Sequence, residues 1–293
     1  MIEFRAIIGI SVAFTTIEIL QQFTYPIYWF NGRAVSEYSG LLEQRMGLWR
    51  FYVWGINYCV LGFFILFQQC INQINLKKNI FLFIYTFLGI VFFVARKNIF
   101  AAIGCIVIGV VFSRQKGSIY SKIMIGAIIV AAIFTLPIFM SELLEQTQNE
   151  LGEDNEDFIR FIAADYFINE MNDSPLYVLM GAGMPSGNSL LEKLILSLQE
   201  NYKIYQDDCG FIGYYSRFGL LGLGTMILLL LRIIVNYKYI DLYLLLFLLF
   251  QLSISFFDFF GNNTRNLAAW AVYLYLIECS IKRNKAMNLK IHN

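Results

Sequence analysis

The chain has 293 residues, of which 58% are hydrophobic and only 15% charged, and its net charge is +1. One soluble core of this length does not need so much apolar surface, so the composition predicts an all-α polytopic membrane protein and disfavours a nucleic-acid binder. Five cysteines stand singly without a CxxC pair, and the one histidine, His292, is next to last. We therefore expect neither a disulfide or zinc framework nor a mechanism based on histidine.

Eight segments have the length and apolarity of membrane-crossing helices. A helix needs about 20 apolar residues to cross the hydrocarbon layer, and fewer inside a bundle. The predicted spans are 6–23, 51–71, 79–95, 98–113, 121–140, 208–231, 239–257 and 264–281. The third and fourth are so close that one re-entrant or kinked unit is the alternative for them. We treat residues 1–293 as a single membrane domain.

Basic residues fall at alternate connections, and such residues are retained on the cytoplasmic side. These are Lys77, Lys78, Arg114, Lys116, Lys122, Arg232, Lys238 and the Lys and Arg residues of the C-terminal tail. Both termini are then cytoplasmic in a bacterial inner membrane, and loop 141–207 is extracytoplasmic. Between Ser141 and Asp208 lie 14 of the 21 acidic residues. Within this loop, 157–171 and 189–202 are predicted to form helices against the membrane surface.

Several cations lie on the outer face, where the orientation rule disfavours them. A bound anion explains such exceptions, and the planar guanidinium of arginine grips phosphate and pyrophosphate oxygens bidentately. The alternative is that each cation snorkels or pairs with a loop carboxylate. We favour a shared anionic site for the set, which comprises Arg45, Arg50, Arg96, Lys97, Arg160 and Arg217.

Arg217 stands in the stretch QDDCGFIGYYSRFGLLG, residues 206–222. Counted from Asp208 at about 1.5 Å per residue, it lies roughly 13 Å below the outer surface. A charge at that depth needs a polar cavity or a partner, and Asp258 and Glu18 are the nearest by depth. A purely structural ion pair is the alternative.

Two loop motifs are candidate ligand-binding sites. Gly181 and Gly183 in LMGAGMPSGN (179–188) predict a tight turn with positive φ that presents backbone amides to an anion. GEDNED (152–157) offers carboxylates for a divalent cation. Its spacing matches no calcium loop, so we interpret it as a solvated acidic surface and expect no metal.

The order of these features resembles the bacterial O-antigen polymerase and ligase superfamily over about residues 40–235. The matching pieces are Arg45-Met46-Gly47, Arg96-Lys97, Arg160, the Leu179–Gly183 turn, and an Asp before GFIGYYSRFGLLGL. The resemblance implies a metal-independent membrane glycosyltransferase without a cofactor. Such enzymes move a glycan from undecaprenyl pyrophosphate to a sugar hydroxyl at the outer face of the inner membrane.

The resemblance also implies residue roles. Arg96, Arg160 and Arg45 grip the pyrophosphate or orient the glycan, because fixed guanidinium groups stabilise the charge of a departing pyrophosphate. Asp208, with Asp207 in reserve, is the general base for the acceptor hydroxyl. Ligases commonly carry a histidine where Asp207-Asp208 stand, which favours a polymerase here. This chain has fewer spans than most members.

The expected partners are the undecaprenyl-pyrophosphate-linked oligosaccharide, the lipid bilayer, and the flippase and chain-length regulator of the same pathway. Two alternatives stay open. One is a ligase that attaches finished glycan to lipid A core or protein. The other is a flippase or transporter for lipid-linked oligosaccharide, suggested by the charges at Glu18, Arg217 and Asp258. A transporter should show internal repeats, and the sequence shows none.

Overall fold

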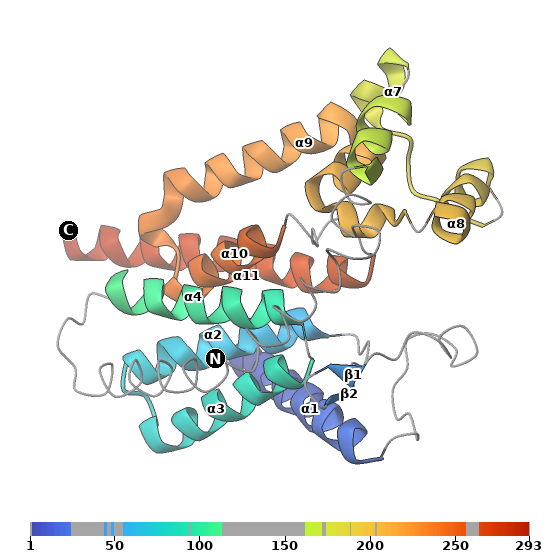
Figure 1. The fold of residues 1–293 in the computed structure, drawn as a ribbon. Coiled ribbons are helices and arrows are strands. Elements are labelled where there is room, and N and C mark those ends of the chain that lie inside the picture. Colours follow the sequence, from blue (N-terminus) through green and yellow to red (C-terminus); the bar gives the residue numbers. More distant parts are fainter. Residues whose placement is uncertain are drawn as a thin grey trace. The chain divides into compact units, whose positions relative to one another are not determined.

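The computed structural model describes residues 2–24, 44–45, 48–49, 55–93, 95–112, 162–171, 174–187, 189–202, 204–255 and 264–292 (Figure 1). Within these ranges the only strands, β1 (Gln44–Arg45) and β2 (Leu48–Trp49), pair as a short antiparallel hairpin, and the other regular elements are helices. The predicted all-α class is confirmed. The chain forms two compact units whose segments alternate along the sequence rather than two consecutive domains. Unit 1 comprises Met1–Leu143, Asp241–Phe250 and Ala268–Ser280, and unit 2 comprises Leu144–Ile240, Gln251–Leu267 and Ile281–Asn293.

Three helices form the centre of unit 1: α1 (Ile2–Thr24), α2 (Ile56–Ile71) and α3 (Leu76–Phe92). Helix α2 is buried on all sides from residue 59 to residue 67, as expected of a helix that is apolar all round. Helix α1 packs closely on its neighbours at two glycines. A β-carbon on Gly62 would overlap the Ser11 hydroxyl, and one on Gly89 would overlap the Thr15 hydroxyl. Small residues at such points allow helix backbones to approach.

Segments distant in sequence complete unit 1. They are α4 (Arg96–Phe112) and parts of α10 (Leu242–Ile254) and α11 (Thr264–His292). The backbone amide of Tyr243 donates to Gln68 Oε1 at 2.8 Å, and the Tyr273 hydroxyl donates to the Leu244 carbonyl at 3.1 Å. Helix α3 ends at Phe92 and α4 begins at Arg96, so this part of the chain forms two helices.

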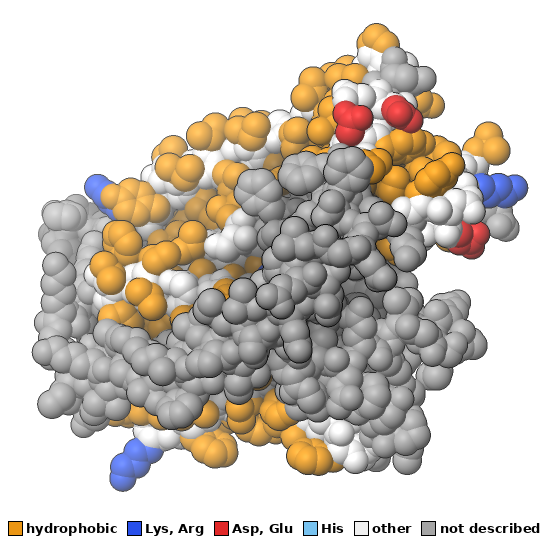
Figure 2. Space-filling view, viewed as in Figure 1, with side chains coloured by type: hydrophobic (Ala, Val, Ile, Leu, Met, Phe, Trp, Pro, Cys, Tyr) orange, Lys and Arg blue, Asp and Glu red, His pale blue; other side chains and the backbone are white. Residues whose placement is uncertain are grey.

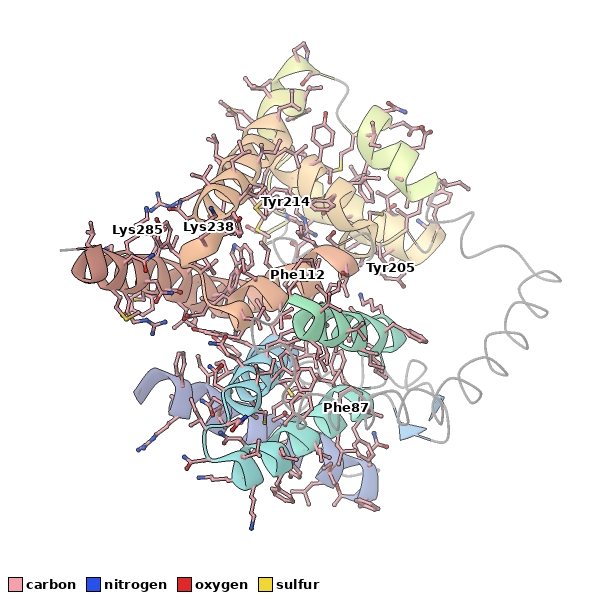
Figure 3. The ribbon with its side chains drawn as sticks, turned by 90° about the vertical axis from the view of Figure 1, so that its left-hand side faces the viewer. Phe87, Phe112, Tyr205, Tyr214, Lys238 and Lys285 are labelled. Carbon is pink, nitrogen blue, oxygen red and sulfur yellow. The ribbon has the colours of Figure 1, made fainter. Side chains whose placement is uncertain are left out.

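Unit 2 contains the whole described part of the predicted loop 141–207. A helix at 162–165 continues as the π-helix η2 (Tyr166–Glu170), followed by α7 (Pro175–Met180) and α8 (Leu190–Tyr202). The 3-10 helix η3 (Gln206–Cys209), the long α9 (Gly210–Asn236) and the short η4 (Tyr237–Tyr239) follow. In Figure 3, Lys238 and Lys285 lie together at one end of this unit and Tyr205 lies at the other.

Serine side chains cap the two loop helices. Ser174 accepts a hydrogen bond from the Tyr177 amide at 3.3 Å, and Pro175 occupies the first helical position of α7. Ser189 accepts from the Glu192 amide at 3.1 Å, with an acidic residue at the third helical position of α8. Local sequence therefore fixes where both helices begin.

Helices occupy seven of the eight segments in which spans were predicted; segment 121–140 lies outside the described residues. In the described part of the chain, two helical segments, Phe4–Thr24 and Gly210–Tyr239, are long and apolar enough to cross a bilayer. Three apolar helices are shorter: Ile56–Ile71, Lys97–Phe112 and Leu242–Ile254. Helix α8 occupies the predicted 189–202 segment, and the described part of the 157–171 segment is helical from residue 162.

Candidate functional site at the head of α9

Helix α9 is kinked at Gly219, which has φ 60° and ψ −161°. This backbone conformation is open to glycine and rarely to any other residue. A break in a helix frees carbonyl groups in the preceding turn, and buried carbonyls need donors. Here the amide of Ala182 donates to the Ser216 carbonyl at 2.8 Å, and the amide of Gly183 donates to the Arg217 carbonyl at 3.0 Å. We call this junction between the Gly181–Gly183 turn and residues 216–219 the clasp.

The clasp requires glycine at two positions. Gly181 has φ 77°, and a β-carbon there would overlap the backbone of Arg217 and Phe218. A β-carbon on Gly219 would meet the backbone of Leu179 and Gly181. Because the obstructing atoms belong to the main chain, no side-chain rotation can relieve either overlap. Two backbones thus approach more closely than a residue with a side chain would allow.

The turn forms as predicted, but its amides face protein rather than ligand. Gly181 and Gly183 both have positive φ, which confirms the predicted tight turn. The Gly181 amide donates to the Tyr177 carbonyl at 2.7 Å, and the next two amides donate to α9. Three successive amides are therefore engaged by the chain itself. The role that the structure supports for Gly181 and Gly183 is to position α9 and Arg217.

Arg217 is buried, with 5% of its surface exposed, and belongs to a chain of polar side chains. Its Nε donates to Gln206 Oε1 at 2.9 Å, and Gln206 Nε2 donates to Ser216 Oγ at 2.7 Å. Ser216 Oγ in turn donates to the Gly213 carbonyl at 2.9 Å. The Gln206 amide fixes the orientation of the guanidinium but, being uncharged, does not neutralise it. We call Gln206, Ser216 and Arg217 the Arg217 node.

The aspartate pair lies beside this node in the chain. Asp207 and Asp208 directly follow Gln206 in η3, and α9 begins two residues later at Gly210. The side-chain positions of both aspartates lie outside the description. Because Gln206 is bonded to Ser216 and Arg217, the backbone that carries both aspartates is held at the head of α9.

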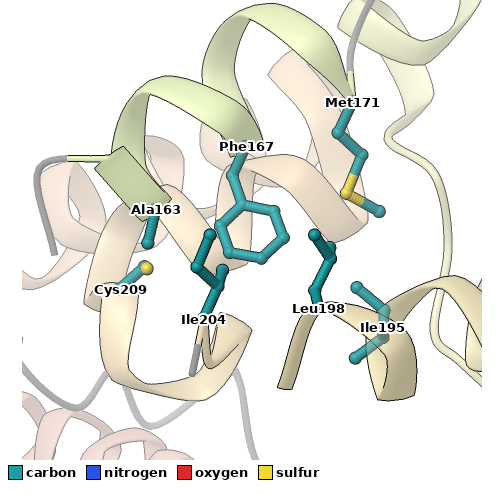
Figure 4. Close-up of a cluster of buried hydrophobic side chains, with 7 residues drawn as sticks. All are labelled: Ala163, Phe167, Met171, Ile195, Leu198, Ile204 and Cys209. Atoms are coloured by element: carbon teal, nitrogen blue, oxygen red, sulfur yellow. The ribbon is translucent and has the colours of Figure 1, made fainter. Parts of the chain in front are cut away.

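A cluster of buried apolar side chains supports the head of α9 from the loop side (Figure 4). It joins the helix at 162–171, helix α8 and η3, and comprises Ala163, Phe167, Met171, Ile195, Leu198, Ile204 and Cys209. The Tyr166 and Phe167 rings contact edge to face, with centroids 5.6 Å apart. Burial and the nearby Glu170 carboxylate raise the pKa of Tyr166, so its hydroxyl stays protonated. The described part of the helix begins at residue 162, and Arg160 precedes it.

The remaining predicted cations belong to unit 1 or lie outside the description. Arg96 is the first residue of α4 and Arg45 pairs with Leu48 in the hairpin, but their side chains are not described. Lys97 is half-buried in the first turn of α4. Arg160 and Asp258 lie outside the described residues. Unit 2 thus brings together Arg217, Gly181, Gly183 and the backbone of Asp207-Asp208.

Sequence reasoning missed Gln206 and Ser216. For Arg217 it named Asp258 and Glu18 as the nearest residues by depth and did not name Gln206, to which the structure bonds it. Asp258 lies outside the described residues, so that prediction stays open. Both missed residues are polar and stand in a stretch that otherwise reads as the start of a span. Their polarity within an apolar stretch could have marked them as candidates. It could not have shown that η3 folds back onto α9 and brings them together.

Unit 1 holds a separate buried carboxyl group. Glu18 on α1 is 0% exposed, and neither of its carboxyl oxygens has a hydrogen-bond partner among the described residues. Ser11 and Thr15, earlier on the same helix, are equally buried, and Thr15 Oγ1 lies 3.7 Å from Cys59 Sγ. Within the described ranges no three His, Cys, Asp or Glu side chains gather into a group that could hold a metal ion.

No protein family, curated protein or solved structure matches this chain.

Proposed function

We propose that this chain is a multi-pass glycosyltransferase of the bacterial inner membrane, of the polysaccharide polymerase type. Its substrate is a glycan linked to undecaprenyl pyrophosphate, and its acceptor is a sugar hydroxyl on another lipid-linked repeat unit at the outer face. The observation that carries the proposal is the Arg217 node, a fixed, buried guanidinium whose hydrogen-bond acceptor Gln206 begins the turn that carries Asp207-Asp208.

The membrane topology in this proposal has eight spans with both termini in the cytoplasm. The apolar helices α1 and α9 support it by length and composition. Exposed Lys77 and Lys78 lie in the first turn of α3, Arg232 lies near the C-terminal end of α9, and Lys238 lies in η4 directly after it. Cations at these connections favour a cytoplasmic location for them. The head of α9, at the opposite end, then faces the outer side.

The proposed chemistry is displacement at an anomeric carbon. Pyrophosphate leaves with growing negative charge, and a cation that is already oriented stabilises this charge without reorganisation. Arg217 supplies such a cation. The pyrophosphate- or glycan-binding roles of Arg96, Arg160, Arg45 and Lys97 stay predictions from the sequence. Asp208 accepts the proton of the acceptor hydroxyl, and Asp207 is the reserve base. No step requires a metal or a cofactor.

The test is Asp208→Asn, with Asp207→Asn as its matched control one residue away. Both are assayed in proteoliposomes supplied with undecaprenyl-pyrophosphate-linked repeat units, with polymer and single repeat units separated by gel electrophoresis. Loss of a general base lowers a rate by about 10²–10⁴-fold. We expect Asp208→Asn to leave single units unjoined while Asp207→Asn still makes polymer. Polymer made by Asp208→Asn at the normal rate would remove the base assignment.

A further inference from the structure

Helix α7 is a short apolar helix with no buried residue. Its sequence is PLYVLM, and Leu176, Tyr177, Leu179 and Met180 are each 44–60% exposed. Ser174 and Pro175 begin the helix through local interactions, so its formation does not depend on burying an apolar face. A helix without a charged residue that exposes four large apolar side chains requires something to cover it.

The clasp fixes α7 at a definite level of α9. Two backbone hydrogen bonds join the turn that ends α7 to Ser216 and Arg217, and Leu179 lies against Gly219. Figure 1 shows α7 at the kinked end of α9, away from its long C-terminal segment. The position of α7 along α9 is therefore set by main-chain contacts.

The exposed apolar face of α9 begins directly after the residues to which α7 is bonded. None of residues 210–219 is exposed, whereas seven large apolar side chains beyond them are 50–78% exposed. These are Leu220, Leu221, Ile227, Leu228, Leu231, Ile234 and Val235. From Leu220 to Tyr237 the helix rises about 26 Å, close to the hydrocarbon thickness of a bilayer, about 30 Å. Hydrophobic side chains cover the face of α9 seen in Figure 2 and continue at its kinked end.

We propose that α7 is seated in the outer leaflet of the bilayer, with its exposed apolar side chains among the acyl chains just below the headgroups. We call the seven exposed apolar side chains of α9 between Leu220 and Val235 the apolar belt. Because α7 is bonded to α9 at the end of this belt, the bilayer that covers the belt also covers α7. Tyr177 and Tyr205, both at this end, suit the interface, where tyrosine is enriched. This position of α7 requires that α9 spans the membrane, but it does not require that the protein transfers glycans.

The experiment attaches a nitroxide label to Leu176→Cys and Met180→Cys and measures collisions with oxygen and with a water-soluble nickel chelate. The full chain is reconstituted in vesicles of phosphatidylethanolamine and phosphatidylglycerol. Leu228→Cys, within the belt, is the lipid control, and Glu200→Cys, exposed on α8, is the water control. Four native cysteines are buried and Cys279 is half-buried, so the signal of the labelled wild type is subtracted.

We expect the oxygen-to-nickel collision ratio at positions 176 and 180 to exceed that at position 200 severalfold and to approach that at position 228. A ratio at both positions equal to that at position 200 would overturn the proposal. Dipolar broadening between labels, with low collision rates for both probes, would show that a second copy of the chain covers α7 and would also overturn it. All four positions are exposed, so folding of the variants is not in question.

Discussion

Replacing Gly219 with alanine tests the clasp on which the Arg217 node depends. The residue has φ 60° and ψ −161°, and a β-carbon would meet the main chain of Leu179 and Gly181. A residue with a side chain held in such a conformation costs about 1–3 kcal/mol. Displacing the two hydrogen bonds from Ala182 and Gly183 adds about 0.5–1.5 kcal/mol each. We therefore expect Gly219→Ala to lower the free energy of unfolding by about 2–6 kcal/mol.

Gly224→Ala is the matched control because it lies in the same helix with no heavy atom within 4 Å of an added β-carbon. Alanine there favours the helix by up to about 1 kcal/mol, so this variant is expected to be neutral or more stable. Both are measured by urea unfolding in detergent, followed by circular dichroism, beside polymer synthesis in proteoliposomes. Equal stability of the two variants would show that neither the kink nor the clasp contributes to the stability of the fold.

Three further predictions concern buried polar groups. Gln206→Leu deprives the Arg217 Nε of its acceptor, so we expect a loss of about 1–3 kcal/mol in unfolding free energy, read by the same urea titration. Gln206→Glu retains the acceptor and places a carboxylate against the guanidinium. It should keep stability and raise the KM for the pyrophosphate-linked donor, and an unchanged KM would contradict a role for that charge. Glu18→Gln keeps the shape of a carboxyl whose oxygens have no partner in the described residues, so stability should be unchanged or higher in a thermal melt. A lowered melting temperature for Glu18→Gln would contradict this expectation.

The positions of helices were predictable because apolar runs of bilayer length leave few alternatives. The predicted span 6–23 became α1 at Ile2–Thr24, and 98–113 became α4 at Arg96–Phe112. Helix ends moved by a few residues, since caps and turns rather than hydropathy set them. The Ser189 cap illustrates this, because it starts α8 within one residue of the predicted position.

The kink and the Arg217 node were not predictable from one sequence. Glycine in a helix is compatible with close packing as well as with a kink, so GLLG read as part of one continuous span over 208–231. What distinguishes Gly219 from Gly224 is the backbone of α7 beside it, a contact between residues about forty positions apart. The hydrogen bond of Gln206 to Arg217 likewise depends on η3 folding back onto α9. Tertiary contacts decided both features.

The depth of Arg217 in the membrane distinguishes the proposed enzyme from a transporter. Counting from Asp208 placed the guanidinium about 13 Å below the surface, a depth that suits a transporter with a site towards the midplane. In the structure, however, Arg217 precedes the first exposed apolar residue of α9, Leu220, and is held by a turn in η3. In the proposed topology its charge therefore lies near the headgroups, where water and phosphate groups lower the cost of burying it. A polyprenyl pyrophosphate carries its own charge at that same level, so a cation there favours an enzyme that meets its substrate from the outer leaflet over a carrier that moves it across.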